Sequence, residues 1–170
     1  MIILGIDPGY AIVGYGIVDY RNNHFNVVDY GAILTDAKTP FNERLEIIYD
    51  RLCQLISIHQ PEAMSVEKVF YNSNAKTVID VSQARGVIML AAQKNHVPVF
   101  EYTPLQVKQS VVGYGRAEKN QIQEMTKRIL SLEKIPKPDD TADALAMAIC
   151  HGHSSGSLSS YGNMKIRKGI

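Results

Sequence analysis

The first residues of the chain limit its fold most, because a short apolar run ends there at a single carboxylate and a sharp turn. Ile2-Ile3-Leu4-Gly5-Ile6 is followed by Asp7-Pro8-Gly9. A continuous apolar run of this length is typical of a buried strand, and Pro-Gly is a turn signal. A second run, Ala63-Met64-Ser65-Val66, places Glu67 in the same way. We therefore expect Asp7 and Glu67 to stand at the ends of two buried strands.

Length and composition indicate one domain with a sizeable core. The chain has 170 residues, 45% of them hydrophobic, and lacks the run of about 18 apolar residues that a membrane span needs. Cys53 and Cys150 stand far apart within apolar helical patterns, so we expect two buried packing residues rather than a disulfide or zinc motif. These features predict a cytoplasmic protein that does not enter a membrane.

Basic residues gather in the second part of the chain, although the net charge is only +1. Residues 101–170 carry 10 Lys and Arg against 7 Asp and Glu, whereas residues 1–100 carry 8 against 10. The basic residues between Tyr102 and Asp139 are Lys108, Arg116, Lys119, Lys127, Arg128, Lys134 and Lys137. Such a run is usually a solvated face, but beside a group of carboxylates it also fits a polyanionic substrate.

The order of predicted elements favours an α/β domain with a five-stranded mixed sheet and helices on both faces. Apolar periodicity and turn residues predict strands over 2–7, 14–20, 24–34, 63–67 and 97–102, and helices over 41–59, 75–95, 117–131 and 139–151, with a short helix after Thr103. We place the domain over residues 1–153. The Ser- and Gly-rich segment 154–170 is predicted to be a flexible tail, because it carries little apolar surface.

Four acids from distant parts of the sequence favour a divalent-metal site. If strands 2–7 and 63–67 are parallel neighbours, Asp7 and Glu67 emerge at one edge of the sheet. Asp140 and Asp143 lie three residues apart on a predicted helix and face the same way. Each acid alone has an ordinary interpretation as a turn former, a strand end or a helix cap. Together they would repel one another without a cation, and oxygen ligands without His or Cys indicate Mg²⁺ or Mn²⁺.

Several segments, in order and spacing, resemble the bacterial RuvC Holliday junction resolvases. The resemblance runs from Ile2 to about His153 and so covers nearly the whole predicted domain. The matching segments are Gly-Ile-Asp7-Pro-Gly, Glu67-Lys-Val-Phe70, Gln83-Ala-Arg-Gly86, Gln106-Val-Lys108-Gln, Val112-Gly-Tyr-Gly-Arg-Ala-Glu118-Lys119 and Asp140-Thr-Ala-Asp143-Ala-Leu-Ala.

This resemblance implies an RNase H-like nuclease fold, a homodimer and two Mg²⁺ ions per active site, which Mn²⁺ could replace. It also implies paired nicks in four-way junction DNA during recombination and repair, with RuvA and RuvB as partners. The family's catalytic and metal-binding acids fall on Asp7, Glu67, Asp140 and Asp143. Its DNA contacts fall on Lys108, Lys119 and Phe70.

Three further residues bear on this assignment. Tyr71 follows Phe70, so both aromatic rings are expected to stack on unpaired bases near the junction centre. Arg116 joins the expected DNA-binding set. Asp139 gives the chain an additional acid beside Asp140, and we prefer Asp140 because its spacing to Asp143 fits the family.

Two other classes of function stay open at this point. Gly-Ile-Asp-Pro-Gly before a hairpin also resembles the first phosphate loop of actin-like sugar kinases and chaperone ATPases, although those proteins duplicate the fold over a longer chain. A DNA-binding module that retains the fold without cleaving is the other alternative.

Overall fold

The described residues form one five-stranded mixed sheet with helices packed against it. The structure, a computed structural model, describes residues 1–68 and 78–166, with side chains as far as residue 155. The strand order is β3-β2-β1-β4-β5, with the strands β1 (Ile2–Asp7), β2 (Ile12–Arg21), β3 (His24–Leu34), β4 (Ala63–Glu67) and β5 (Val99–Tyr102). The first three form an antiparallel meander, and β4 and β5 run parallel to β1. The expected parallel pairing of the strands that carry Asp7 and Glu67 is confirmed.

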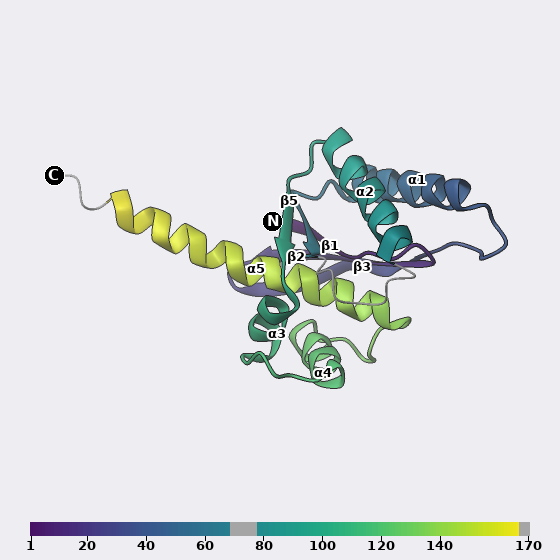
Figure 1. Cartoon of the computed structure of the whole chain (residues 1–170). Coiled ribbons are helices and arrows are strands. Elements are labelled where there is room, and N and C mark those ends of the chain that lie inside the picture. Colours follow the sequence, from purple (N-terminus) through teal and green to yellow (C-terminus); the bar gives the residue numbers. More distant parts are fainter. Residues whose placement is uncertain (69–77, 167–170) are drawn as a thin grey trace.

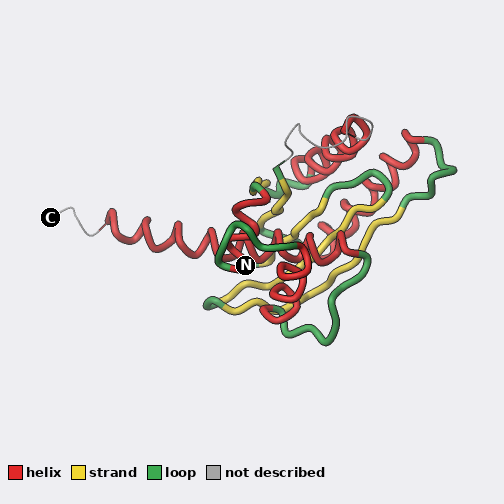
Figure 2. The backbone as a smooth tube through the Cα atoms, turned by 60° about the horizontal axis from the view of Figure 1, so that its bottom comes forward, coloured by secondary structure: helices red, strands yellow, loops and turns green. Residues whose placement is uncertain are grey.

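Helices cover both faces of the sheet, which confirms the expected α/β class. The helices α1 (Phe41–His59) and α2 (Val78–Lys94) lie on one face, and α3 (Pro104–Val112), α4 (Lys119–Ile129) and α5 (Asp139–Ile166) lie on the other (Figure 1). The expected end of the last helix at His151 is wrong, since α5 continues to Ile166 and its C-terminal half extends past the sheet (Figure 2). The flexibility of residues 154–170 stays a prediction.

Local sequence signals account for both ends of α3. The predicted short helix after Thr103 is α3, where Thr103 and Gln106 form a capping box with Pro104 at the first helical position. Gly113 ends α3 in the left-handed conformation, with φ of 92°. Because these short-range signals fix α3, the residues that follow are directed toward α4 on the same face of the sheet.

Alternation along β1 divides the protein into two cores. Leu4 and Ile6 pack against α1 and α2, whereas Ile3 packs against α5. Side chains of neighbouring strand residues point to opposite faces, so Gly5 and Asp7 share the α5 face with Ile3. The end of β1 therefore presents its carboxylate to α5.

Glycines on β1 and β2 let α5 approach the sheet very closely. Gly5 pairs with Gly16 and Gly14 pairs with Asp7 across the two strands. A Cβ at Gly5 would lie 2.0 Å from a backbone oxygen of α5, and one at Gly14 would lie 2.0 Å from the carbonyl oxygen of Asp140. Real side chains do not tolerate such distances, so the missing Cβ atoms bring the start of α5 to the end of β1.

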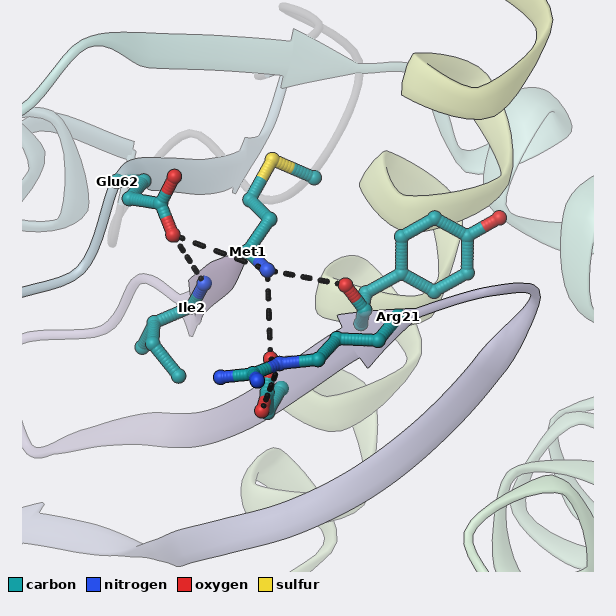
Figure 3. A network of polar contacts seen from close by, with 6 residues as sticks. Met1, Ile2, Arg21 and Glu62 are labelled. Carbon is teal, nitrogen blue, oxygen red and sulfur yellow. Dashed lines mark hydrogen bonds and ion pairs between the residues drawn. The ribbon is translucent and has the colours of Figure 1, made fainter.

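Polar contacts of the first residue hold β1 at its other end (Figure 3). The Met1 ammonium donates to the carbonyl oxygen of Tyr20 at 3.0 Å and forms an ion pair with Asp19 at 3.3 Å. The Ile2 N–H donates to Glu62 Oε1 at 3.0 Å. These contacts tie β1 to β2 and to the segment before β4, and so support the register that brings Asp7 and Glu67 to one edge.

The cysteines and the helix compositions can also be compared with what the sequence predicted. Cys150 is buried, as expected, whereas Cys53 is only half-buried against the core; both are free cysteines. Within residues 1–68 and 78–166, none of the helices combines the length and apolarity that crossing a membrane requires.

Replacing Gly14 tests the close approach of α5. We expect Gly14→Ala to lower the free energy of unfolding by about 1–3 kcal/mol, because the added methyl group displaces the start of α5. Urea denaturation measures the change. Ser57→Ala, on the exposed face of α1, is the control and should stay within about 0.5 kcal/mol of wild type. An unchanged unfolding midpoint for Gly14→Ala would contradict the packing described above.

Candidate active site

A cavity of about 260 Å³ opens where β1 and β4 end beneath α5. It brings together five of the predicted site residues, each from a different element. They are Asp7 of β1, Glu67 of β4, Lys108 of α3, Lys119 of α4 and Asp143 of α5. Apolar residues complete the wall: Val107, Ile122, Ala146 and Met147, with Pro104. Three acids and two lysines thus share one concave site.

The strand pleat directs Glu67 into this cavity. The Ser65 hydroxyl donates to the carbonyl oxygen of Met147 at 2.8 Å, which places Ser65 on the face that α5 covers. Glu67 lies two residues further along β4 and therefore faces the same side. Asp7 reaches the cavity in the same way from β1, so both strand-end carboxylates meet below Asp143.

Asp140 lies beside the cavity rather than among the residues that line it. Its backbone rests on Gly14, the residue paired with Asp7. Its charge acts on two acids of the cavity, because it helps to raise the pKa of Asp7 and of Asp143. The four predicted acids therefore form one electrostatic group, with Asp140 at its margin.

Burial and mutual repulsion make these carboxyl groups resist ionisation. The pKa of Asp7 is raised from 3.8 to about 8, first by burial and then by the charges of Asp143, Glu67 and Asp140, in that order. Burial, and then the charge of Asp143, raises the pKa of Glu67. Burial also raises the pKa of Asp143, although Lys119 opposes that effect. A cation in this cavity would remove the repulsion that holds these values high.

Lys119 is the cation that the acids hold in this structure. Its Nζ lies 3.0 Å from Asp143 Oδ2 and 3.7 Å from Asp139 Oδ2. The contact with Asp143 raises the pKa of Lys119, and the ammonium in turn lowers the pKa of Asp7. Lys137 forms a second ion pair with Asp139 at 2.5 Å. The charges at the start of α5 thus form one connected network.

The donor set fits a hard divalent cation, although its side chains do not form a finished cage. Carboxylate oxygens are the ligands that Mg²⁺ and Mn²⁺ prefer, and here they come from β1, β4 and α5. Among residues 1–68 and 78–155, no three His, Cys, Asp or Glu side chains are already arranged to hold one ion. Ion binding would therefore have to draw the carboxylates together and release Lys119 from Asp143.

The remaining predicted DNA contacts have different outcomes. Lys108 is half-buried in the cavity wall, as its assignment requires. Arg116 is exposed in the turn between α3 and α4 and does not line the cavity. Phe70 and Tyr71 lie outside the described residues, so their stacking role stays a prediction.

Arg44 of α1, on the face of the sheet opposite the cavity, is a buried residue that was not predicted from the sequence. Its Nε donates to Thr35 Oγ1 at 2.8 Å, and its guanidinium donates to the carbonyl oxygen of Tyr10 at 3.2 Å. The Thr35 hydroxyl donates to the same carbonyl at 2.6 Å, and the guanidinium carbon lies 4.7 Å from the centre of the Tyr10 ring. This network fixes the loop that follows Asp7.

The sequence did contain a signal for Arg44. Arg44 stands four residues before Ile48, on the helical stripe that continues through Leu52 and Ile56. A basic residue on a buried stripe needs acceptors inside the protein. That spacing could have predicted a buried, hydrogen-bonded arginine.

Comparisons with known proteins agree with this geometry. The sequence model of the family described as Crossover junction endodeoxyribonuclease RuvC matches residues 3–151. The protein of that name from Ruminiclostridium cellulolyticum is 60% identical over 154 residues, which cover 91% of this chain and 93% of the relative. Its counterpart from Clostridioides difficile is 57% identical over 155 residues, covering 91% and 92%.

Solved structures give the same result for the fold. Thermus thermophilus RuvC in complex with a Holliday junction substrate superposes with a TM-score of 0.86 at 33% identity, covering 91% of this chain and 94% of that one. The yeast mitochondrial Holliday junction resolvase Ydc2 has a TM-score of 0.68 at 16% identity, covering 95% and 83%, and so shares the fold. The RNase H-like fold expected from the sequence is confirmed.

The raised pKa of Asp7 predicts a distinctive pH dependence of stability in the metal-free protein. Folded Asp7 keeps its proton up to about pH 8, whereas the unfolded chain releases it near 3.8, so stability falls as pH rises between these values. Asp7→Asn carries no charge. In the presence of chelator at pH 8.5, we expect it to exceed wild type in unfolding free energy by at least about 1.4 kcal/mol, the equivalent of one pKa unit.

Urea denaturation at pH 5 and pH 8.5 measures this difference, which should be smaller at pH 5. Glu133→Gln, at an exposed loop position, is the matched control and should follow wild type at both pH values. If Asp7→Asn were the less stable protein at pH 8.5, the repulsion described for this site would be absent.

Proposed function

We propose that this chain, which belongs to the RuvC family of crossover junction endodeoxyribonucleases, resolves four-way DNA junctions by paired symmetric nicks. The single observation that supports this most is the cavity in which carboxylates from β1, β4 and α5 meet two lysines. Acids that resist ionisation need a cation, and lysines beside them suit a phosphate. Such a site fits phosphodiester hydrolysis in DNA recombination and repair.

We infer that Asp7, Glu67 and Asp143 hold two Mg²⁺ ions, with Asp140 completing the set from the margin; Mn²⁺ fits the same donors. When bound, a pair of such ions activates water and stabilises the leaving oxygen of the phosphodiester. Asp7 lies on the central strand and is the most strongly perturbed acid, which suits a ligand shared by both ions. Asp140 is assigned to bind metal or orient the attacking water.

The lysines of the cavity are assigned to the DNA backbone. Lys108 of α3 and Lys119 of α4 both line the cavity. Their ammonium groups would meet the scissile phosphate and offset the charge that develops on it. Arg116 in the α3–α4 turn would extend this basic surface, and Phe70 and Tyr71 are assigned to unpaired bases at the junction centre.

A homodimer suits a substrate with near two-fold symmetry that is cut twice. Helix α2 carries more apolar side chains than one buried face needs. In the structure Ala84 and Ile88 face the core, while Ile79 is 64% exposed and Leu90 is 50% exposed. We infer that a second copy covers this outer face. RuvA and RuvB as partners, and the cytoplasm as the compartment, complete the proposal by family resemblance.

The two alternative functions differ in how strongly the observations argue against them. The ATP-binding reading leaves Asp140 and Asp143 without a role, and the family match over residues 3–151 disfavours it. A non-cleaving DNA-binding module differs from the proposal only in activity, so a cleavage assay separates the two.

The decisive experiment compares synthetic four-way junctions with linear duplexes in Mg²⁺. Wild type should nick the junction symmetrically and leave the duplex intact. Asp7→Asn should lose cleavage by at least about a thousandfold, since the loss of a shared metal ligand removes the electrostatic stabilisation of the reaction, yet it should still shift the junction in a gel. Ser57→Ala, on the exposed face of α1, is the control and should cleave normally. Turnover by Asp7→Asn near the wild-type rate would refute the assignment.

A further inference from the structure

Asp139 is an acid of the α5 terminus that the proposed ligand set does not use. It is 43% exposed and does not line the cavity. Its charge acts on Asp143, but it is not among the groups that raise the pKa of Asp7. Its carboxylate instead contacts two lysines, Lys137 at 2.5 Å and Lys119 at 3.7 Å. Asp139 is therefore connected to the site through Lys119.

Lys119 and an incoming divalent cation would compete for one oxygen atom. The ammonium lies 3.0 Å from Asp143 Oδ2, an oxygen that the proposed function assigns to a metal ion. Two cations cannot occupy one carboxylate oxygen closely without strong repulsion. Lys119 must therefore leave Asp143 when the ion arrives, and its side chain, 57% exposed, has room to move.

Asp139 is the second carboxylate that forms an ion pair with Lys119 and can accept the displaced ammonium. Its Oδ2 already lies 3.7 Å from Lys119 Nζ, so a small rotation of the lysine side chain would complete that ion pair. Lys137 contacts the other oxygen, Oδ1, so the two lysines do not share one acceptor atom of Asp139. The movement keeps a positive charge beside the cavity, where a phosphate would lie, while it frees the metal ligand.

We propose that Asp139 is a positioning residue that receives Lys119 when Asp143 takes up a divalent cation. The proposal rests on the metal site of the proposed function and adds a role for an acid outside that site. It predicts that loss of Asp139 weakens metal binding by leaving Lys119 on Asp143, and that the effect depends on Lys119 being present.

Titration with Mn²⁺ alone, followed by the loss of the free-ion EPR signal, tests this without DNA or turnover. Asp139→Asn should weaken Mn²⁺ binding about fivefold, the upper range for one exposed ion pair. In a Lys119→Met background the same substitution should change binding by less than about twofold, because no lysine then competes. Asp139→Glu keeps the carboxylate and should bind within about twofold of wild type.

Glu124→Gln on α4 removes one exposed negative charge and is the matched control; it should bind Mn²⁺ as wild type does. Circular dichroism melting checks that each variant is folded. If Asp139→Asn weakened Mn²⁺ binding equally with and without Lys119, Asp139 would act only as a distant charge, and the proposal would be overturned. Unchanged Mn²⁺ binding in both backgrounds would overturn it as well. A wild-type protein that binds no Mn²⁺ would overturn the metal site itself, a result distinct from the failure of this inference alone.

Discussion

The repulsion among carboxylates at the end of β1 is the interaction on which the rest of the site depends. Folding places Asp7 where burial and three neighbouring acids all oppose its ionisation, and its pKa rises to about 8. The carboxylates stay together only if the backbone around them is held firmly, because moving apart would reduce their electrostatic repulsion. Lys119 relieves part of it now, and a divalent cation would relieve it more fully. The positive charge of Lys119 therefore offsets only part of the repulsion among the carboxylates, and a bound divalent cation would offset the rest.

The close packing of α5 on the sheet holds these carboxylates together, and it depends mainly on glycines in β1 and β2 that lack side chains. Glycines where other strands carry side chains let the backbone of α5 touch the sheet, so that a helix terminus and two strand ends share one cavity. At the other end of β1 the Met1 ammonium and Glu62 hold the strand in register. On the opposite face Arg44 fixes the loop after Asp7. Three separate sets of contacts thus hold the Asp7 carboxylate where burial and neighbouring charges oppose its ionisation.

Much of this arrangement follows from short-range patterns in the sequence. The apolar runs before Asp7 and Glu67 predicted two buried strands, and the crossover between them predicted that they run parallel if they are neighbours. The short helix predicted after Thr103 is present as α3. These signals act over a few residues, so they can be recognised without the fold.

Features that depend on contacts between distant segments could not be predicted in the same way. Gly14 is ordinary in a strand sequence until α5 is seen to rest on it, and Asp139 looked like a competitor of Asp140 until its lysine partners were known. The length of α5 was also misjudged, because Ser and Gly after His151 suggested an end that the helix passes. Tertiary contacts decide such cases, and local propensity does not.

The central claim is that these separate acids converge to hold divalent cations. Crystals soaked in Mn²⁺ and recorded at a wavelength where manganese scatters anomalously would test it most directly. The account predicts anomalous peaks inside the cavity, in ligand contact with Asp7, Glu67 and Asp143, with the Lys119 ammonium moved away from Asp143. Manganese bound only elsewhere, with Lys119 still on Asp143 at ion concentrations that support cleavage, would contradict it.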